Sequence, residues 1–330
     1  SRPLALPGNP FAGALIDSTQ ALELNTLPSS AVIIGAGAVA LEFASLWNAA
    51  GCEVTLLIRK DRVLSTWERR ASMTLTRELK RRGVNVIART AVDRVDTGAN
   101  LGATVHYRQG DSDEDRTAYG EVVLAAIGRV PNTDADWFRS SGLKLDERGY
   151  VTVDGYGRTN LDGVWALGDI TPGHALAHRA FEQGITIAEK IAGADPKPVL
   201  DDTVPQVVFS FPEAASVGLT LDQAKAREDV VEPKETAYPM LSNARMLMSG
   251  EGGSMTVVSG AFANNPDMQV VLGVHIVSPI ASDLIAEAEQ LVGNRVPLAD
   301  AARLIHPHPT FSETLGEALL KADGRPLHTR

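Results

Sequence analysis

The chain has 330 residues, of which 44% are hydrophobic, so it can bury several cores, and disordered or collagen-like chains are excluded. At about 150 residues per domain, this length predicts two or three domains. Its 31 basic and 41 acidic side chains give a formal net charge of −10, which makes nucleic acid and anionic membranes poor partners.

Three features bear on where the chain resides. The uncharged stretch at residues 28–41 is too short to cross a bilayer, which takes about 20 apolar residues. The opening Ser1-Arg2-Pro3 lacks the charged and apolar regions of a secretory signal. Cys52 is the only cysteine, so neither an intrachain disulfide nor a cysteine-based zinc site can form. We therefore expect a cytoplasmic protein and assign it no metal site.

The first part of the chain alternates strand and helix patterns. Apolar runs at residues 31–34 and 54–58 predict strands, and helical spacing follows each of them, at 39–50 and 67–82. A third short strand at 84–87 completes a βαβαβ order. Such alternation is typical of a parallel sheet.

The pattern then changes to short strands. Residues 90–95, 103–109 and 121–126 predict a hairpin or meander, interrupted by a polar turn at 110–115.

The middle of the chain is rich in loops. After loop-rich residues 132–158 we expect a short buried strand at 164–167, a helix at 175–192 and a linker at 194–205. The remainder is α+β. Its predicted strands are residues 206–210, 254–259 and 270–277, and its predicted helices are 221–228, 282–292, 297–305 and 311–322.

A glycine-rich turn lies between the first predicted strand and helix. The run Gly35-Ala36-Gly37-Ala38-Val39-Ala40 fits the pattern G-x-G-x-x-G/A. Gly35 permits the tight turn, Gly37 lets backbone amides approach a pyrophosphate, and Ala40 lets the helix pack closely on the strand. The alternative is a turn without a ligand, but the βαβ context favours dinucleotide binding.

The end of the second strand bears on the choice of nucleotide. An acidic residue there would accept from the 2'-hydroxyl of NAD, but Ile58 is followed by Arg59 and Lys60, which suit the 2'-phosphate of NADP. The basic pair could equally be a solvated surface patch. Glu42, in the first turns of the glycine-loop helix, could be there simply because the helix dipole favours a carboxylate.

Two further groups of residues could act in catalysis or in ligand binding. In residues 308–313, the spacing lets Glu313 reach back to His308, which is the arrangement of a general base and its orienting carboxylate. The alternative is a capping box between Thr310 and Glu313. Asp169, after Gly168, could accept a hydroxyl hydrogen bond at the end of a short strand or simply form a turn.

Several motifs together resemble the pyridine nucleotide-disulfide oxidoreductases. They occur in the family's order along nearly the whole chain, and within the family they look most like dihydrolipoamide dehydrogenases, with some features of glutathione reductases. The motifs are residues 35–42, IRKDRVL (58–64), AIGRVPNT (126–133), GVWALGD (163–169), LAHRAFEQG (176–184), LSNARMLMSGE (241–251) and HPHPTFSE (306–313).

The resemblance implies an α/β architecture. It assigns residues 1–18 to a lead-in remnant, 19–133 to a Rossmann-like NAD(P)-binding domain, 134–203 to the second part of an FAD-binding Rossmann-like domain, and 204–330 to an α+β dimerisation domain. The family's FAD-binding segment, with its own glycine loop and a redox-active C-x4-C pair, does not occur in this sequence. We therefore expect the 330-residue chain alone to be inactive and to bind FAD weakly.

The resemblance also implies roles for single residues. His308 would be the base for the dithiol and Glu313 would orient it, both acting on the flavin of the opposite subunit. The implied cofactor contacts are Gly35, Gly37, Ala40, Glu42, Arg59, Lys60, Gly128, Gly168, Asp169, Leu176, Ala177 and His178. Of these, Asp169 would bind the ribityl chain of FAD, and residues 176–178 would line the flavin.

The activity implied is oxidation of dihydrolipoamide with FAD and NAD+, with NADP left open. One alternative is an NADPH-dependent disulfide or quinone reductase, and another is a truncated, non-catalytic module for nucleotide binding and dimerisation. We expect a homodimer, formed through an apolar helical stripe, and a lipoyl-bearing acyltransferase complex as partner. Burial of the stripe in the core of its own domain is the alternative. The stripe consists of Ile280, Leu284, Ile285, Ala288, Leu291 and Val292.

Overall fold

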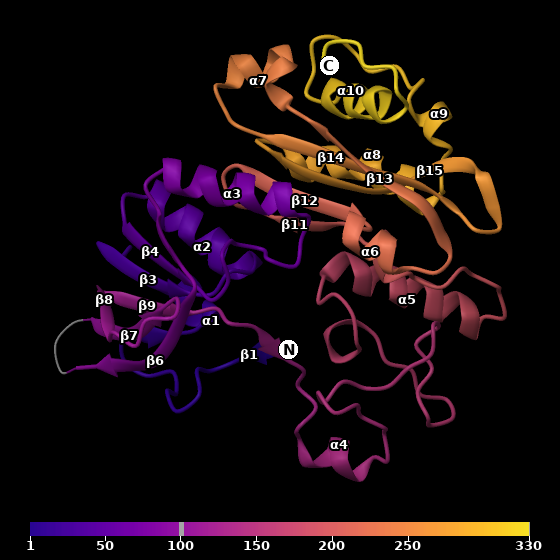
Figure 1. Ribbon diagram of the computed structural model, residues 1–330. Coiled ribbons are helices and arrows are strands. Elements are labelled where there is room, and N and C mark those ends of the chain that lie inside the picture. Colours follow the sequence, from indigo (N-terminus) through magenta and orange to yellow (C-terminus); the bar gives the residue numbers. More distant parts are fainter. Residues whose placement is uncertain (99–101, 330) are drawn as a thin grey trace. The chain divides into compact units, whose positions relative to one another are not determined.

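The computed structural model describes residues 1–98 and 102–329, and the chain divides into two compact units. The smaller unit combines Ser1–Leu4 with Gly128–Val204, and the larger combines Ala5–Ile127 with Pro205–Arg330 (Figure 1). Among the described residues, no helix is both long and apolar enough to cross a membrane.

The first half of the larger unit is built on a five-stranded parallel sheet. Its order is β2-β9-β3-β4-β5, so the predicted βαβαβ arrangement is confirmed. The strands are β2 (Leu15–Ile16), β3 (Ser30–Ile34), β4 (Glu53–Ile58), β5 (Asn85–Ala88) and β9 (Val122–Ala125), and the helices are α1 (Ser18–Leu22), α2 (Ala38–Ala49) and α3 (Arg69–Arg81). Helix α2 buries Leu41, Ala44 and Trp47 in the core of this sheet.

A three-stranded antiparallel sheet is inserted after β5. It consists of β6 (Thr90–Thr97), β7 (Ala103–Gln109) and β8 (Arg116–Gly120). The sequence predicted residues 121–126 as the third strand of this sheet, and that prediction is wrong. Residues 122–125 form β9 of the parallel sheet, and the polar strand β8 is the third strand here. Among the residues that the structure describes, strand β8 pairs only with β7, so its largely exposed, polar side chains need no apolar pattern.

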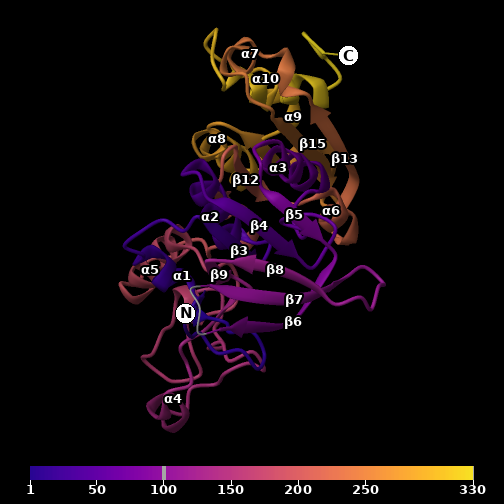
Figure 2. The same cartoon turned by 90° about the vertical axis from the view of Figure 1, so that its left-hand side faces the viewer.

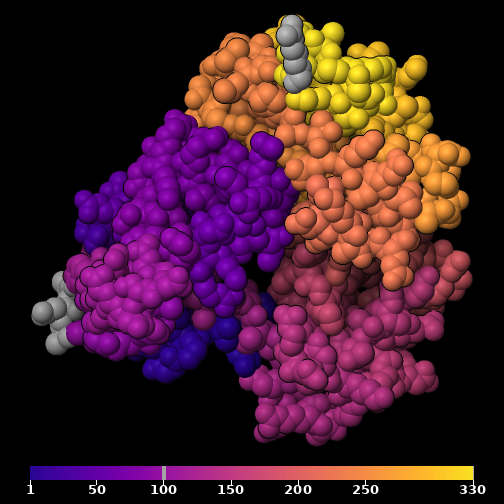
Figure 3. Space-filling model, in the orientation of Figure 1, coloured from indigo at the N-terminus to yellow at the C-terminus, as the bar shows by residue number. Residues whose placement is uncertain are grey.

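The second half of the larger unit is an antiparallel sheet with helices. Its order is β11-β12-β15-β14-β13. The strands are β11 (Gln206–Val208), β12 (Glu213–Gly218), β13 (Val230–Tyr238), β14 (Ser254–Phe262) and β15 (Asn265–Ser278), and the helices are α6 (Leu221–Ala226), α7 (Ala244–Ser249), α8 (Ala281–Gly293), α9 (Leu298–Ala301) and α10 (Glu313–Ala322). Helix α3 packs on β14 and β15, and in the space-filling view its violet atoms abut the orange atoms of the later segment (Figure 3).

The apolar stripe of α8 faces inward. Helix α8 lies against β12 and β15 (Figure 2), and Leu284, Ile285, Ala288 and Leu291 are buried in the core of their own chain. The prediction that this stripe forms the dimer interface is therefore wrong. The sheet of the same domain already covers it, as the alternative interpretation expected.

The smaller unit consists mainly of loops. It contains the short pair β1 (Arg2–Pro3) and β10 (Arg129–Val130), the helices α4 (Asp136–Ser140) and α5 (Ala177–Ile191), and 3-10 turns at Gly168–Ile170 and Asp201–Thr203. The strand expected at 164–167 does not form. Val164 and Leu167 are each 38% exposed, and Trp165 makes only an isolated bridge to Arg158. A short apolar run needs a neighbouring strand to pair with before it becomes part of a sheet.

Candidate functional site

The glycine-rich turn has the geometry that its sequence predicts. Gly35 follows β3 with φ +143°, and a Cβ atom there would collide with the carbonyl of Ala126 and lie 3.3 Å from the Cβ of Ala40. Ala40 is fully buried. Gly37 is the N-cap of α2, and a Cβ built on it would meet no atom within 4 Å. Gly35 and Ala40 therefore serve packing, whereas Gly37 faces open space.

This open space lies at the N-terminus of α2. The first amides of a helix have no partner within the helix and carry the positive end of its dipole, so they attract a phosphate group. Here the carbonyl of Gly37 already accepts from the amide of Leu41 at 3.1 Å, which fixes where the helix begins. The residues present fit a dinucleotide pyrophosphate.

Glu42 lies one turn further along α2 and holds a distant loop. Its Oε1 accepts a hydrogen bond from the amide of Phe209 at 3.0 Å, and the hydroxyl of Ser45 accepts one from the amide of Phe211 at 2.8 Å. The carboxylate is thus more than a favourable charge near a helix N-terminus. It ties the glycine-loop helix to the segment between β11 and β12.

The basic pair after β4 is exposed. Arg59 and Lys60 follow Ile58, the last residue of the strand, and both side chains face solvent. The next arginine differs, because Arg62 is only 18% exposed, bonds to the carbonyl of Ser65 at 3.1 Å and pairs with Asp61 at 3.0 Å. Arg59 and Lys60 are therefore available to a phosphate, while Arg62 shapes the loop.

The predicted flavin contacts Gly168, Asp169 and residues 176–178 lie in the smaller unit, as does the predicted cofactor contact Gly128. Gly128 has φ +140°, and its carbonyl accepts from the amide of Leu4 at 3.0 Å. Asp169 lies in the 3-10 turn, 39% exposed, with the hydroxyl of Ser1 donating to it at 2.6 Å. Gly168 precedes it with φ +70°, a value that favours glycine. A partly exposed carboxylate on a tight turn can accept a hydrogen bond from a hydroxyl group, so Asp169 fits the hydroxyl-bearing ribityl chain.

The three residues at the start of α5 are also accessible. Leu176 is the half-buried N-cap, and Ala177 and His178 are exposed. The helix has 15 residues, so its first turn offers backbone amides to a ligand as the resemblance implies.

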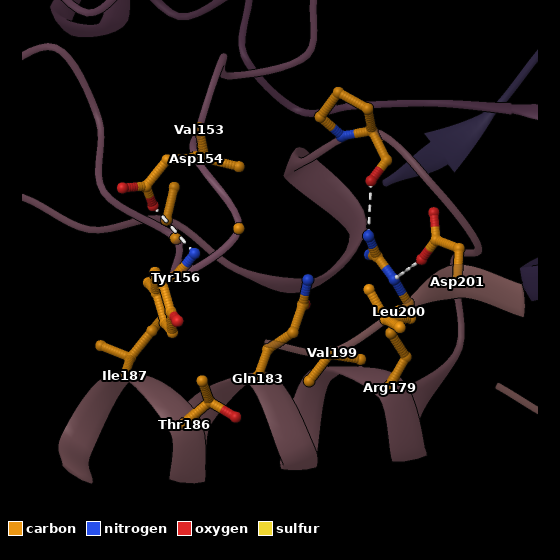
Figure 4. A pocket seen from close by; sticks show the side chains of 14 residues that line it. Val153, Asp154, Tyr156, Arg179, Gln183, Thr186, Ile187, Val199, Leu200 and Asp201 are labelled. Carbon is orange, nitrogen blue, oxygen red and sulfur yellow. Dashed lines mark hydrogen bonds and ion pairs between the residues drawn. The ribbon is translucent and has the colours of Figure 1, made fainter. Parts of the chain in front are cut away.

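A cavity of about 310 Å³ lies beside this helix (Figure 4). Gln183 lines it and accepts from the amide of Gly168 at 2.9 Å through its side-chain oxygen. Arg179, only 6% exposed, bonds to Asp201 at 2.7 Å and to the carbonyl of Pro172 at 2.5 Å. The sequence did not predict that Arg179 and Gln183 support the surrounding loops, although both belong to the LAHRAFEQG motif. They hold the Gly168 turn and the loops around it in place.

His308 and Glu313 come together as predicted. The Nδ1 atom of His308 lies 2.8 Å from Oε1 of Glu313, and the bond between His308 and Pro309 is cis. The imidazole is 75% exposed, whereas the carboxylate is 22% exposed. Since Nδ1 is engaged, Nε2 is the ring nitrogen that remains to receive a proton from solvent or a substrate.

Two hydrogen bonds keep Glu313 ionised. Its partial burial acts to raise the pKa of this carboxyl, but hydrogen bonds from the Thr310 amide and from His308 outweigh it and hold the pKa below its usual value. The Thr310 amide donates to Oε2 at 2.8 Å. Only this half of the expected capping box is present. The Thr310 hydroxyl bonds to the carbonyl of Pro307 at 2.6 Å, and α10 begins at Glu313 after the N-cap Ser312.

Known sequences match the chain along nearly its whole length. The family model described as pyridine nucleotide-disulphide oxidoreductase matches residues 1–184, and the model of that family's dimerisation domain matches residues 204–319. The dihydrolipoyl dehydrogenase of Cupriavidus necator is 36% identical over 98% of the chain and 66% of its own length. That of Geobacillus stearothermophilus is 37% identical over 99% and 68%. The chain thus spans about two thirds of these relatives.

Solved structures agree with this assignment. LpdA from Mycobacterium tuberculosis superposes with a TM-score of 0.85 at 28% identity, covering 97% of this chain and 68% of that one. The HOCl-induced flavoprotein disulfide reductase RclA from Escherichia coli superposes with a TM-score of 0.82 at 25% identity, covering 96% and 71%. The family models, the curated relatives and the fold therefore lead to one assignment: the chain belongs to the pyridine nucleotide-disulphide oxidoreductases and carries their dimerisation domain.

Proposed function

We propose that the chain is the nucleotide-binding and base-bearing part of a dihydrolipoamide dehydrogenase. Dihydrolipoamide loses two electrons and two protons to become lipoamide, and NAD+ takes up a hydride, so one proton is released. The observation that carries this proposal is the His308–Glu313 pair, with a 2.8 Å contact and an exposed imidazole. Relatives named dihydrolipoyl dehydrogenase support the choice of substrate.

The base chemistry follows from the geometry of this pair. A thiol has a pKa of about 8.5, so at neutral pH it must lose its proton before it attacks a disulfide. His308 would accept that proton at Nε2. Glu313 would fix the orientation of the ring through Nδ1 and stabilise the imidazolium that forms, while its bond to the Thr310 amide keeps the carboxylate in place.

The cofactors would bind at residues in both units. FAD, when bound, supplies the relay that passes electron pairs from dithiol to nicotinamide. Asp169 and the start of α5 would hold it, with Gly168 and Gly128 shaping the turns. The loop from Gly35 to Ala40 would bind the NAD pyrophosphate. Arg59 and Lys60 are the feature that favours the alternative, an NADPH-dependent disulfide or quinone reductase.

The assay requires an active preparation in which these 330 residues are accompanied by a flavin and a redox-active cysteine pair. We expect it to reduce NAD+ with dihydrolipoamide and to lose that turnover in His308→Ala. Turnover only with NADPH and a disulfide or quinone would replace the proposal by the reductase alternative. Nucleotide binding without turnover of any of these substrates would favour the alternative that the chain is a non-catalytic module.

We also propose a homodimer formed through the C-terminal domain, with a lipoyl-bearing acyltransferase as the larger assembly's partner. Large exposed apolar side chains support the dimer: Leu241, Leu247, Met248 and Ile305 are 62%, 63%, 72% and 97% exposed. Contiguous exposed apolar patches mark interaction surfaces, and we propose that these side chains contribute to one. Sedimentation should give a dimer that Ile305→Glu dissociates, while Leu27→Glu, at a 59% exposed leucine outside that domain, should not.

A further inference from the structure

A second histidine lies two residues before the proposed base and is almost buried. The side chain of His306 is 9% exposed, and its Nε2 lies 2.9 Å from Oε1 of Glu287 on α8. Burial alone would lower the pKa of this imidazole. The hydrogen bond that the ring donates to Glu287 is the largest influence on this pKa and raises it above its ordinary value, which favours the charged imidazole and an ion pair with the carboxylate.

The other face of this ring rests on α10. Gly316 lies in the interior of that helix, and a Cβ atom there would be 2.5 Å from Nδ1 of His306 and 2.8 Å from Cε1. Glycine is unfavourable inside a helix, so its presence requires a packing reason. The contact with the imidazole supplies that reason. His306 thus lies between α8 and α10 and connects them.

The loop that follows His306 carries the proposed base. Its far end is fixed by Glu313, which accepts from the Thr310 amide, and by Asn243, whose side chain donates to the carbonyl of Thr310 at 3.0 Å. Its near end has His306 as the buried anchor. The exposed ring of His308 lies between these two fixed points, so its direction depends on both.

Resting on the proposed role of His308, we propose that His306 is a positioning residue. Through Glu287 on one side and Gly316 on the other, it holds the loop so that Nδ1 of His308 meets Glu313. It does not contact substrate. It determines which ring nitrogen of His308 is free to take the proton.

The tautomer of His308 tests this proposal without any turnover. In the dyad, Nδ1 carries the hydrogen and Nε2 is free, and nitrogen-15 shifts of labelled histidine distinguish the two tautomers. We would record them on the full 330-residue chain at a pH where His308 is neutral, assigning the signal from its loss in His308→Gln. The wild-type chain should show mainly the Nδ1–H form.

Two substitutions approach His306 from opposite sides. Glu287→Gln removes the charge of its partner, and Gly316→Ala places a methyl group where the ring lies. Each should lower the ratio of the Nδ1–H to the Nε2–H form of His308 by about tenfold, the effect of losing one charge-assisted hydrogen bond. The matched control is Glu289→Gln on the same helix. Among the described polar side chains, the Glu289 carboxylate contacts only Gln290, so this substitution should leave the tautomer ratio of His308 unchanged.

The outcomes separate the two proposals. A wild-type His308 in the Nε2–H form would refute the dyad, and with it both the base and its positioning. A wild-type Nδ1–H form that survives both substitutions would refute the positioning role of His306 alone. The buried His275 serves as an internal reference for the fold, since its signal should remain unchanged in every variant.

Discussion

Replacing Gly35, the first glycine of the nucleotide loop, should act mainly by destabilising the fold. In Gly35→Ala, the new methyl group would have to occupy a backbone with φ +143° and would collide with the carbonyl of Ala126 in β9's continuation. Holding a non-glycine residue in such a conformation costs about 1 to 3 kcal/mol. Overpacking of a filled core costs about 1 to 3 kcal/mol more. The free energy of unfolding should therefore fall by about 2 to 6 kcal/mol.

The matched substitution is Gly37→Ala, two residues away. Its φ of −92° suits any residue, and its Cβ would meet no protein atom within 4 Å. Alanine is a poorer N-cap than glycine, so the expected loss of stability is at most about 1 kcal/mol. The methyl group would, however, stand in the open space where a pyrophosphate must approach the amides of α2. In Gly37→Ala, nucleotide affinity should therefore fall although the free energy of unfolding changes little.

Two measurements on each variant separate these effects. Urea denaturation followed by circular dichroism gives the free energy of unfolding, and calorimetric titration with NAD+ and NADP+ gives affinity. A Gly35→Ala variant as stable as wild type would refute the close approach to Ala126. A Gly37→Ala variant that binds both nucleotides at wild-type affinity would show that the ligand does not bind at this turn.

Three further predictions concern the charged residues. In the active preparation, His308→Ala should lower turnover by about 10²- to 10⁴-fold, the usual contribution of a general base, and unchanged kinetics would leave only a structural role. Replacing Arg59 and Lys60 by alanine should reduce NADP+ affinity by about tenfold or more while sparing NAD+, and equal effects on both nucleotides would make the pair a surface patch. The raised pKa of His306 means that its pair with Glu287 stabilises the fold fully below about pH 6.5 and ceases to do so as the pH rises through the folded-state value. Glu287→Gln should therefore destabilise the chain more in urea melts at about pH 5.5 than at about pH 9, where only the hydrogen bond of the neutral ring remains, and a pH-independent difference would contradict the ion pair.

The parallel sheet was predictable because its central strands are buried on both faces. Strands β3 and β4 are continuous apolar runs followed by helical spacing, and the structure places both in the centre of the sheet. Edge strands lack this signal. Strand β13, with the sequence VVEPKETAY, was missed because it contains a proline and charged residues and is irregular between Val231 and Lys234. Its position at the sheet edge tolerates all three features.

The local parts of the site were also predictable, and the long-range parts were not. The pairing of His308 with Glu313 spans five residues, so the spacing shows that the two side chains can meet, although it fits a capping box as well. The partner of Glu42 is a backbone amide 167 residues away, and the partner of His306 lies on a different helix. No periodicity in one sequence encodes such contacts, because they depend on how elements that are distant in the sequence pack together.

The only cysteine limits what these 330 residues can do alone. Cys52 is 5% exposed, and burial, helped by Glu121 and Glu53, raises the pKa of its thiol to about 11. At neutral pH it is therefore almost entirely protonated, whereas thiol–disulfide exchange requires an accessible thiolate and a second cysteine to complete it. The isolated polypeptide should not oxidise dihydrolipoamide with NAD+, even when FAD is added, and a thiol reagent should modify Cys52 only after unfolding. Steady NADH production by the isolated polypeptide, or labelling of folded Cys52 as fast as a free thiol, would show that this cysteine takes part in the chemistry after all.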